Sequence, residues 1–199
     1  MLNPGRFEKQ LRFLVEIDQV KQVLRNTILM DASRRENDAE HTWHMAVCAL
    51  LFKEYANEPN LDLLKVVKMI LLHDLVEIDA GDTFAYDAAG SSTQTAREQQ
   101  AAARIFGLLP EDQKNEFKAL WEEFEAAQTP ESQYAHAIDT FMPILHNYQT
   151  QGLQWRRFKV TSDQVRQRNQ VKIKKGSKVL AEYIETLLKD AVEKGYLQR

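Results

Sequence analysis

One long apolar segment, residues 61–77, limits what this chain can fold into. It reads Leu-Asp-Leu-Leu-Lys-Val-Val-Lys-Met-Ile-Leu-Leu-His-Asp-Leu-Val-Glu, and a helix of this composition is apolar on most of its faces and packs in a core. Near its end it carries His73 and Asp74 side by side. Burying an imidazole and a carboxylate costs free energy unless something compensates their polarity. The segment therefore predicts a core helix with a polar centre built into it.

A divalent metal ion would compensate both side chains, and the chain offers two more ligands of the same kinds. His41 precedes the pair and Asp139 follows it, each in a segment predicted to be helical. Imidazole and carboxylate groups suit Zn, Mn, Co, Ni, Fe or Mg, and the absence of Cys from the set argues against a thiolate site. Four residues are therefore predicted to hold one divalent ion: His41, His73, Asp74 and Asp139. A His-Asp pair that is hydrogen-bonded without metal is the alternative.

Two acidic residues follow the apolar segment closely. Glu77 lies one helical turn beyond Asp74, on the same side of the helix, and Asp82 follows Gly81 in the next loop. A bound metal lowers the pKa of water toward neutrality, and a carboxylate beside that water orients it or transfers a proton. Glu77 by itself also fits a solvated helix end. With the ligand set present, Glu77 and Asp82 are predicted to be catalytic.

The remaining histidines are given less direct roles. His44, three residues after His41, is expected to support a ligand or to pack in the core. His136 lies one turn before Asp139 and is expected beside the site or in solvent. His146 is expected to be an ordinary packed or surface residue.

The rest of the chain favours helix almost throughout. Only seven Gly and five Pro fit long regular elements, and no segment predicts a strand. The sequence therefore predicts one all-α domain, a helical bundle that spans residues 1–199. Apolar spacing and capping residues predict its helices over 7–24, 37–55, 62–78, 95–106, from 110, 130–149 and 177–194. The polar loop at 79–92 is expected to act as a lid or site wall, and 155–163 to be irregular.

Several classes of protein are disfavoured by composition. The single Cys48 excludes an internal disulfide and, with no recognisable signal peptide, favours the cytoplasm. The apolar run before His73 is too short, and too interrupted by Lys65 and Lys68, to span a bilayer. A net charge of −3 gives no reason to expect nucleic acid binding.

Positive charge is nevertheless concentrated in residues 156–178. This segment has nine Lys or Arg and a single acid, Asp163. A solvated basic face is the first interpretation. A subunit contact, or steering of a phosphate group near the mouth of a site, is the second.

Three segments together resemble the HD-domain metal-dependent phosphohydrolases, and within them the branch that contains bacterial 5′-deoxynucleotidases. They are Arg34-Arg-Glu-Asn-Asp-Ala-Glu-His-Thr-Trp-His44, Ile70-Leu-Leu-His-Asp-Leu-Val-Glu-Ile-Asp-Ala-Gly-Asp82 and Ala137-Ile-Asp139. The resemblance runs from about residue 7 to residue 149. It implies a helical bundle that holds one divalent ion, Glu77 as the catalytic acid, Asp82 near the phosphate or sugar, and a homodimer.

One departure from that branch concerns the substrate. The deoxynucleotidase pattern has an Arg with a neighbouring Trp after the first helix, whereas Arg25 has no Trp beside it. The planar guanidinium of Arg25 still suits phosphate oxygens, and Arg25 or Arg34 is expected to bind the phosphate. The choice between deoxyribose and ribose stays open.

The expected function is that of a phosphohydrolase with a small phosphorylated substrate. The first hypothesis is a phosphomonoesterase that releases phosphate from (deoxy)nucleoside 5′-monophosphates through a metal-bound hydroxide. A hydrolase of another phosphate ester or diester is the alternative among enzymes. The alternative outside the enzymes is a non-catalytic regulatory binding module whose fold is held together by a metal ion.

Overall fold

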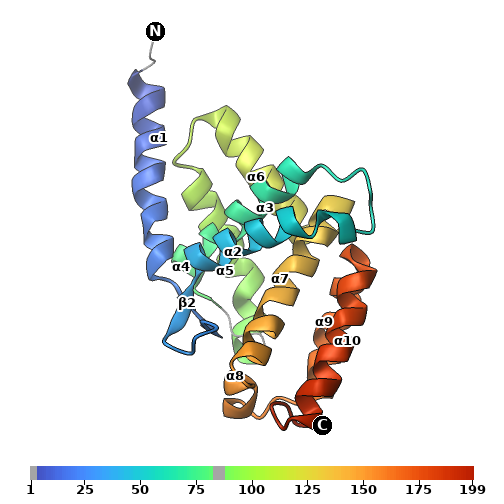
Figure 1. The fold of residues 1–199 in the computed structure, drawn as a ribbon. Coiled ribbons are helices and arrows are strands. Elements are labelled where there is room, and N and C mark those ends of the chain that lie inside the picture. The colour runs from blue at the N-terminus through green and yellow to red at the C-terminus, as the bar shows by residue number, and fades with distance from the viewer. Residues whose placement is uncertain (1–3, 83–87) are drawn as a thin grey trace.

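The structure is a computed structural model that describes residues 4–82 and 88–199, with no side-chain detail for 88–92. The described chain is mainly helical, with one small sheet (Figure 1). In chain order the elements are α1 (Pro4–Ile17), β1 (Leu24–Ile28), β2 (Arg35–Asn37), α2 (Asp38–Leu51), α3 (Leu63–His73), α4 (Glu77–Ala80), α5 (Ala88–Phe106), α6 (Glu111–Ala126), α7 (Pro130–Gln149), α8 (Leu153–Arg157), α9 (Ser162–Gly176) and α10 (Lys178–Glu193). The middle of the expected lid, 83–87, lies outside the described residues.

The apolar segment forms the centre of the molecule. Its helix α3 packs against α2, α6 and α7 (Figure 1). Val66, Met69 and Ile70 are completely buried, which confirms the predicted core helix. α7 contacts α3 and also packs against α9 and α10. No helix among the described residues is long and apolar enough to cross a lipid bilayer.

A capping box fixes the start of α2. The Asn37 side chain accepts a hydrogen bond from the Glu40 amide at 2.9 Å, and the Glu40 carboxylate accepts one from the Asn37 amide at 3.2 Å. This arrangement satisfies two amides that a helix start leaves unpaired. The capping box thereby fixes how β2 joins α2, and with it the positions of Glu36, Asp38 and His41.

Two short strands are present where the sequence analysis predicts none. β1 and β2 pair antiparallel, with Leu24 opposite Asn37. The helix predicted over 7–24 ends at Ile17, and a 3-10 turn at Asp18–Gln22 leads into β1. The prediction was wrong here because a three-residue strand is too short to show a period of two.

α9 is a further element that the sequence analysis did not predict. Of its apolar side chains, only Val165 and Ile173 are buried, so it has no continuous apolar stripe to reveal a helix. Gly176, at its end, lies so close to α7 that an added Cβ would be 2.2 Å from the carbonyl oxygen of Gln133. Glycine therefore permits the close approach of α9 to α7.

Candidate metal centre and substrate pocket

The core helix changes geometry where it carries the candidate ligands. α3 ends at His73, and a 3-10 turn over Asp74–Val76 leads into α4. Adjacent side chains on an α-helix diverge by about 100°, whereas a 3-10 turn brings residues three apart into line. The turn lets the Nε2 atom of His73 and the Oδ1 atom of Asp74 approach to 3.0 Å. It also directs Asp74 and Glu77 into the same cavity.

The four predicted ligands come together from three helices. Nε2 of His41, on α2, lies 3.1 Å from Oδ1 of Asp139, on α7. One ligand atom from each of His41, His73 and Asp139 lies within 4.8 Å of the others. Asp74 joins this group through its contact with His73. The arrangement therefore brings together donors of the kinds that can hold a divalent ion.

Both imidazole rings are oriented from behind. Nδ1 of His73 donates a hydrogen bond to the carbonyl oxygen of Ile70 at 2.7 Å. Nδ1 of His41 faces Oε2 of Glu36 at 3.5 Å. The hydrogen bond to Ile70 selects the tautomer of His73 and leaves Nε2 for a metal, whereas the Glu36 carboxylate only faces the back of the His41 ring. Each ring thus presents Nε2 to the carboxylates, and the donor set of two imidazoles and two carboxylates fits a divalent ion.

The centre is strongly polarised. Burial lowers the pKa of His73, but the neighbouring Asp74 and Asp139 carboxylates outweigh burial and raise this pKa to about 9. Burial opposes ionisation of Asp74, yet His73 and Arg25 bring the pKa of Asp74 down to about 2. The carboxylates therefore attract a positive charge to the imidazoles, and a metal ion would replace the proton there.

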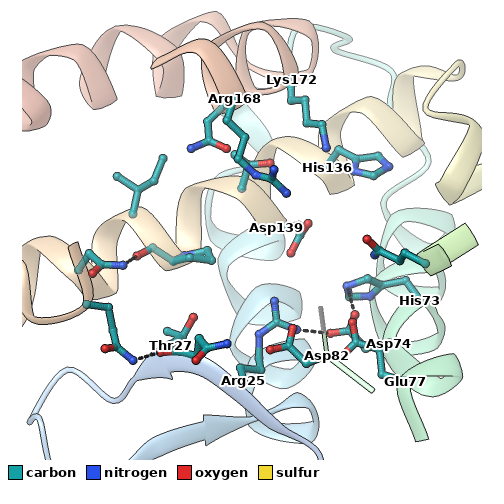
Figure 2. A pocket seen from close by; sticks show the side chains of 18 of the residues that line it. Arg25, Thr27, His73, Asp74, Glu77, Asp82, His136, Asp139, Arg168 and Lys172 are labelled. Atoms are coloured by element: carbon teal, nitrogen blue, oxygen red, sulfur yellow. Dashed lines mark hydrogen bonds and ion pairs between the residues drawn. The ribbon is translucent and has the colours of Figure 1, made fainter. Parts of the chain in front are cut away.

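A cavity of about 300 Å³ opens beside this centre. Asp74, Glu77, Asp82 and Asp139 line one part of it, as Figure 2 shows. The volume is at the lower end of the range for small-molecule sites. The candidate centre therefore borders a space of suitable size for a small ligand.

The two predicted catalytic acids both line this cavity. Glu77 is nearly buried, and its Oε2 atom has no hydrogen-bond partner among the described residues. Burial, followed by repulsion from Asp74 and Asp38, raises the pKa of Glu77 well above its usual value. Gly81 has a φ of +74°, which favours glycine and ends α4 just before Asp82. Burial also raises the pKa of Asp82.

The two predicted phosphate-binding arginines lie in different places. Arg25 lines the cavity, and its Nη1 atom donates to Asp74 at 2.9 Å and to Asp38 at 3.1 Å. Arg34 instead forms an exposed bidentate ion pair with Glu40, at 2.9 and 2.5 Å, and does not line the cavity. Arg34 is therefore left out of the proposed site.

The family model described as HD domain matches residues 17–181. The chain belongs to the HD domain family. This HD-domain protein is 31% identical to the human 5′-deoxynucleotidase HDDC2 over 145 residues, which cover 72% of this chain and 69% of the relative.

Solved structures agree with the predicted all-α bundle. A protein from Magnetospirillum magnetotacticum MS-1, described as a predicted metal-dependent phosphohydrolase, is 47% identical with a TM-score of 0.94. The match covers 100% of this chain and 99% of that one. The PH0347 protein from Pyrococcus horikoshii OT3 shares the fold at 20% identity, with a TM-score of 0.60 and coverage of 92% and 99%.

Part of the basic segment of this HD-domain protein lines the cavity. Arg168 and Lys172 are four residues apart on α9 and face the acidic side, as Figure 2 shows. Lys174 and Lys175, on the same helix, are exposed and do not line it. The segment therefore has an exposed basic part and a part that lines the cavity. The concentration of Lys and Arg is visible in the sequence, but it could not be assigned to the cavity because helix α9 was not predicted.

The other histidines of the HD-domain protein lie in distinct surroundings. His136 lines the cavity, and its Nε2 atom is hydrogen-bonded to the carbonyl oxygen of Phe124 at 2.7 Å. His44 is partly buried and stacks on Trp43. His146 is 2% exposed and therefore belongs to the interior.

Proposed function

We propose that this protein is a metal-dependent 5′-nucleotidase that releases phosphate from (deoxy)nucleoside 5′-monophosphates. One observation carries the proposal: the His/Asp centre and the cations of α9 border the same small cavity. Cations stabilise the charge of a nucleotide phosphate, and a metal-dependent phosphoester hydrolase needs a metal centre and a proton carrier within reach of it. The relatives named 5′-deoxynucleotidase support the choice of substrate class.

Each group in the cavity has a separate task in this proposal. His41, His73, Asp74 and Asp139 hold one divalent ion. Such an ion, when bound, polarises a phosphoryl oxygen and makes water more acidic. Arg25, Arg168 and Lys172 bind the phosphate oxygens. Glu77 holds or moves a proton at the cavity wall, and Asp82 contacts the phosphate or the sugar.

The direct test is phosphate release by chelator-treated protein from ribo- and deoxyribonucleoside 5′-monophosphates. We expect activity only after Co, Mn, Mg, Zn, Ni or Fe(II) is restored. The ratio of deoxy to ribo turnover would define the sugar preference in the absence of a Trp beside Arg25. No release from any monophosphate by protein that has bound metal would reject the nucleotidase proposal. Panels of other phosphate esters and diesters would then separate a different hydrolase from a regulatory module.

Replacing Lys172 with alanine is expected to raise KM for a nucleotide about tenfold with a smaller change in kcat. A charge-assisted hydrogen bond contributes about 1.5–3 kcal/mol, and solvent at this exposed residue reduces the effect toward 1.4 kcal/mol, which is tenfold. Lys174→Ala on the same helix is the matched control, because Lys174 does not line the cavity. Equal KM values for the two variants would remove Lys172 from the phosphate site.

We also propose a homodimer and a cytoplasmic location. α1 exposes Leu11, Leu14 and Val15 at 43%, 59% and 74%, and exposed apolar side chains grouped on one helix favour a protein contact. Light scattering should give the mass of two chains for the wild type and of one chain for Leu14→Glu. A monomeric wild type would reject the dimer.

The proposed cytoplasmic location is supported by Cys48. This residue is buried as a free thiol, which fits a reducing compartment.

A further inference from the structure

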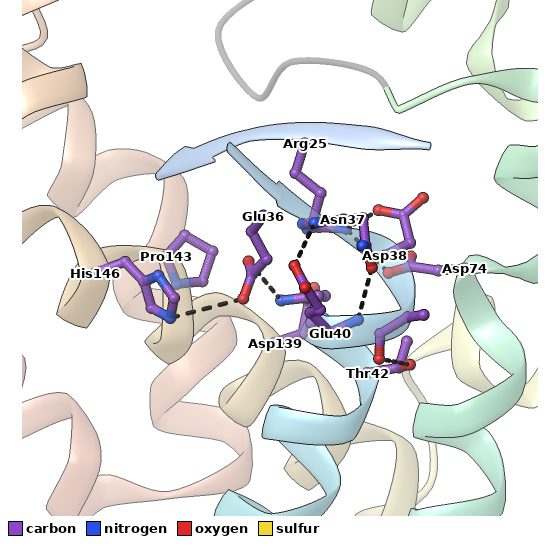
Figure 3. A network of polar contacts seen from close by, with 12 residues as sticks. Arg25, Glu36, Asn37, Asp38, Glu40, Thr42, Asp74, Asp139, Pro143 and His146 are labelled. Carbon is purple, nitrogen blue, oxygen red and sulfur yellow. Dashed lines mark hydrogen bonds and ion pairs between the residues drawn. The ribbon is translucent and has the colours of Figure 1, made fainter. Parts of the chain in front are cut away.

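A second group of metal-ligand side chains lies behind the candidate centre. It consists of Glu36 on β2, His44 on α2 and His146 on α7. One ligand atom from each lies within 4.8 Å of the others. Figure 3 shows Glu36 between the helices, with the ring of His146 directed toward it. None of these residues lines the substrate cavity.

Two members of this group, Glu36 and His146, are buried and each has one polar atom without a hydrogen-bond partner among the described residues. Nδ1 of His146 contacts the carbonyl oxygen of Ile28 at 3.0 Å, so it must carry the proton that it donates. The opposite nitrogen, Nε2, has no hydrogen-bond partner among the described residues and faces Oε1 of Glu36 at 3.7 Å. Glu36 is 1% exposed and His146 is 2% exposed. A lone pair that faces a carboxylate in the interior is unfavourable unless a cation or a proton lies between them.

The chemistry and spacing of the group suit a divalent ion. Two imidazoles and one carboxylate are a common ligand set for Zn, Fe(II) and related metals. Two ligands of one tetrahedral zinc ion lie roughly 3.5 Å apart, given metal–ligand distances near 2.1 Å. The 3.7 Å between His146 and Glu36 is close to that value. His44 is only partly buried, so its side of the group gives an ion a route from the surface.

We propose that Glu36, His44 and His146 form a second divalent-metal site, separate from the centre at His73. The second site adjoins the first through Glu36, because its Oε2 atom lies 3.5 Å from Nδ1 of His41. A carboxylate bound to the second ion is held in place, and it then keeps the His41 ring directed toward Asp139. This link rests on the ligand role proposed for His41, whereas the second site itself does not.

Metal counting tests the site without reference to activity. Metal-free protein is loaded with Zn²⁺, freed of excess ion by gel filtration and analysed by elemental mass spectrometry. We expect His44→Gln and His146→Gln each to bind one equivalent less than the wild type. His136→Gln is the matched control and should bind as much as the wild type. Undiminished zinc in His44→Gln would overturn the proposal and would leave Glu36 and His146 as a contact without a metal.

Two further variants separate the second site from the first. His73→Ala should lose the first ion and keep the second, and His44→Gln should do the reverse, so the double variant should lose both. Glu36→Gln should lose the second ion and also weaken the first by about 10- to 100-fold, because it removes the negative charge that faces His41. Should His146→Gln fail to fold by circular dichroism, the partly exposed His44 position still decides. An inactive wild type that binds both ions would reject the proposed function and retain this site.

Discussion

Replacing His73 with alanine is expected to remove the ion at the first centre and to lower phosphate release by at least roughly 10³-fold. The Nε2 atom of His73 faces Asp74 at 3.0 Å, and its ring is fixed by Ile70. Without this ligand the remaining carboxylates lose the shared cation that makes their proximity favourable. Metal assistance contributes several kcal/mol to such reactions, and 1.36 kcal/mol corresponds to a factor of ten. Elemental analysis and a phosphate-release assay measure both effects.

Asp139→Asn is the second variant, because it keeps the shape of a side chain that contacts His41 at 3.1 Å. It should lose the ion and the activity as well. His136→Ala is the control, since that ring is bonded to a backbone carbonyl rather than to the centre. Full metal content at the first centre in both His73→Ala and Asp139→Asn would reject the ligand assignment.

Thermal unfolding provides an independent measurement of the same event. An ion present at 100 times its dissociation constant stabilises the fold by about 2.7 kcal/mol. For a chain of this size, each kcal/mol shifts Tm by about 2–4 °C. Adding metal should therefore raise the wild-type Tm by roughly 5–11 °C and should raise that of His73→Ala by clearly less.

The His73-Asp74 pair could be singled out from the sequence because its signal is local. A His-Asp pair inside an apolar helix contradicts its surroundings, and this contradiction is visible without any tertiary information. The structure places His73 and Asp74 against His41 and Asp139, as that reasoning suggested. The 3-10 turn at Asp74–Val76 could not be predicted, because its residues fit an α-helix equally well.

The arginines show where sequence reasoning reaches its limit. Arg25 and Arg34 have the same chemistry and lie close together in the chain. Their different positions depend on their ion-pair partners. Arg25 pairs with Asp38 and Asp74 beside the cavity, whereas Arg34 pairs with Glu40 at the surface. Neither outcome follows from local pattern, since the strand that carries Arg25 was itself not predicted.

The group of Glu36, His44 and His146 was also missed, because it too depends on tertiary contacts. Glu36 lies on a three-residue strand and His146 lies far along the chain on α7. Their contact depends on the packing of β1, whose Ile28 carbonyl orients His146. The sequence analysis treated His146 as an ordinary residue, and only the fold reveals that its Nε2 atom faces a buried carboxylate.

Replacing Glu77 with glutamine is expected to keep the metal and to lower kcat by about 10²- to 10⁴-fold, which is the usual contribution of a group that transfers a proton. Glu77 lines the cavity beside Asp74, and its Oε2 atom has no partner among the described residues. The amide preserves size but cannot exchange a proton. Steady-state kinetics together with metal analysis would separate this role from that of a ligand. Loss of metal would make Glu77 a ligand, and unchanged kcat would remove it from catalysis.

The stability of the same variant distinguishes a functional carboxyl from a structural one. Burial and the Asp74 and Asp38 carboxylates raise the pKa of Glu77, so its ionised form is held in an unfavourable environment. A neutral glutamine relieves that repulsion, and the Tm of Glu77→Gln should equal or exceed that of the wild type. Glu122→Gln, at an exposed ion pair with Lys118, is the control and should change neither Tm nor kcat. A Glu77→Gln variant that is as stable as the wild type and yet inactive would mean that Glu77 serves the reaction and does not stabilise the fold. A marked fall in Tm would instead mean that Glu77 supports the packing of the site.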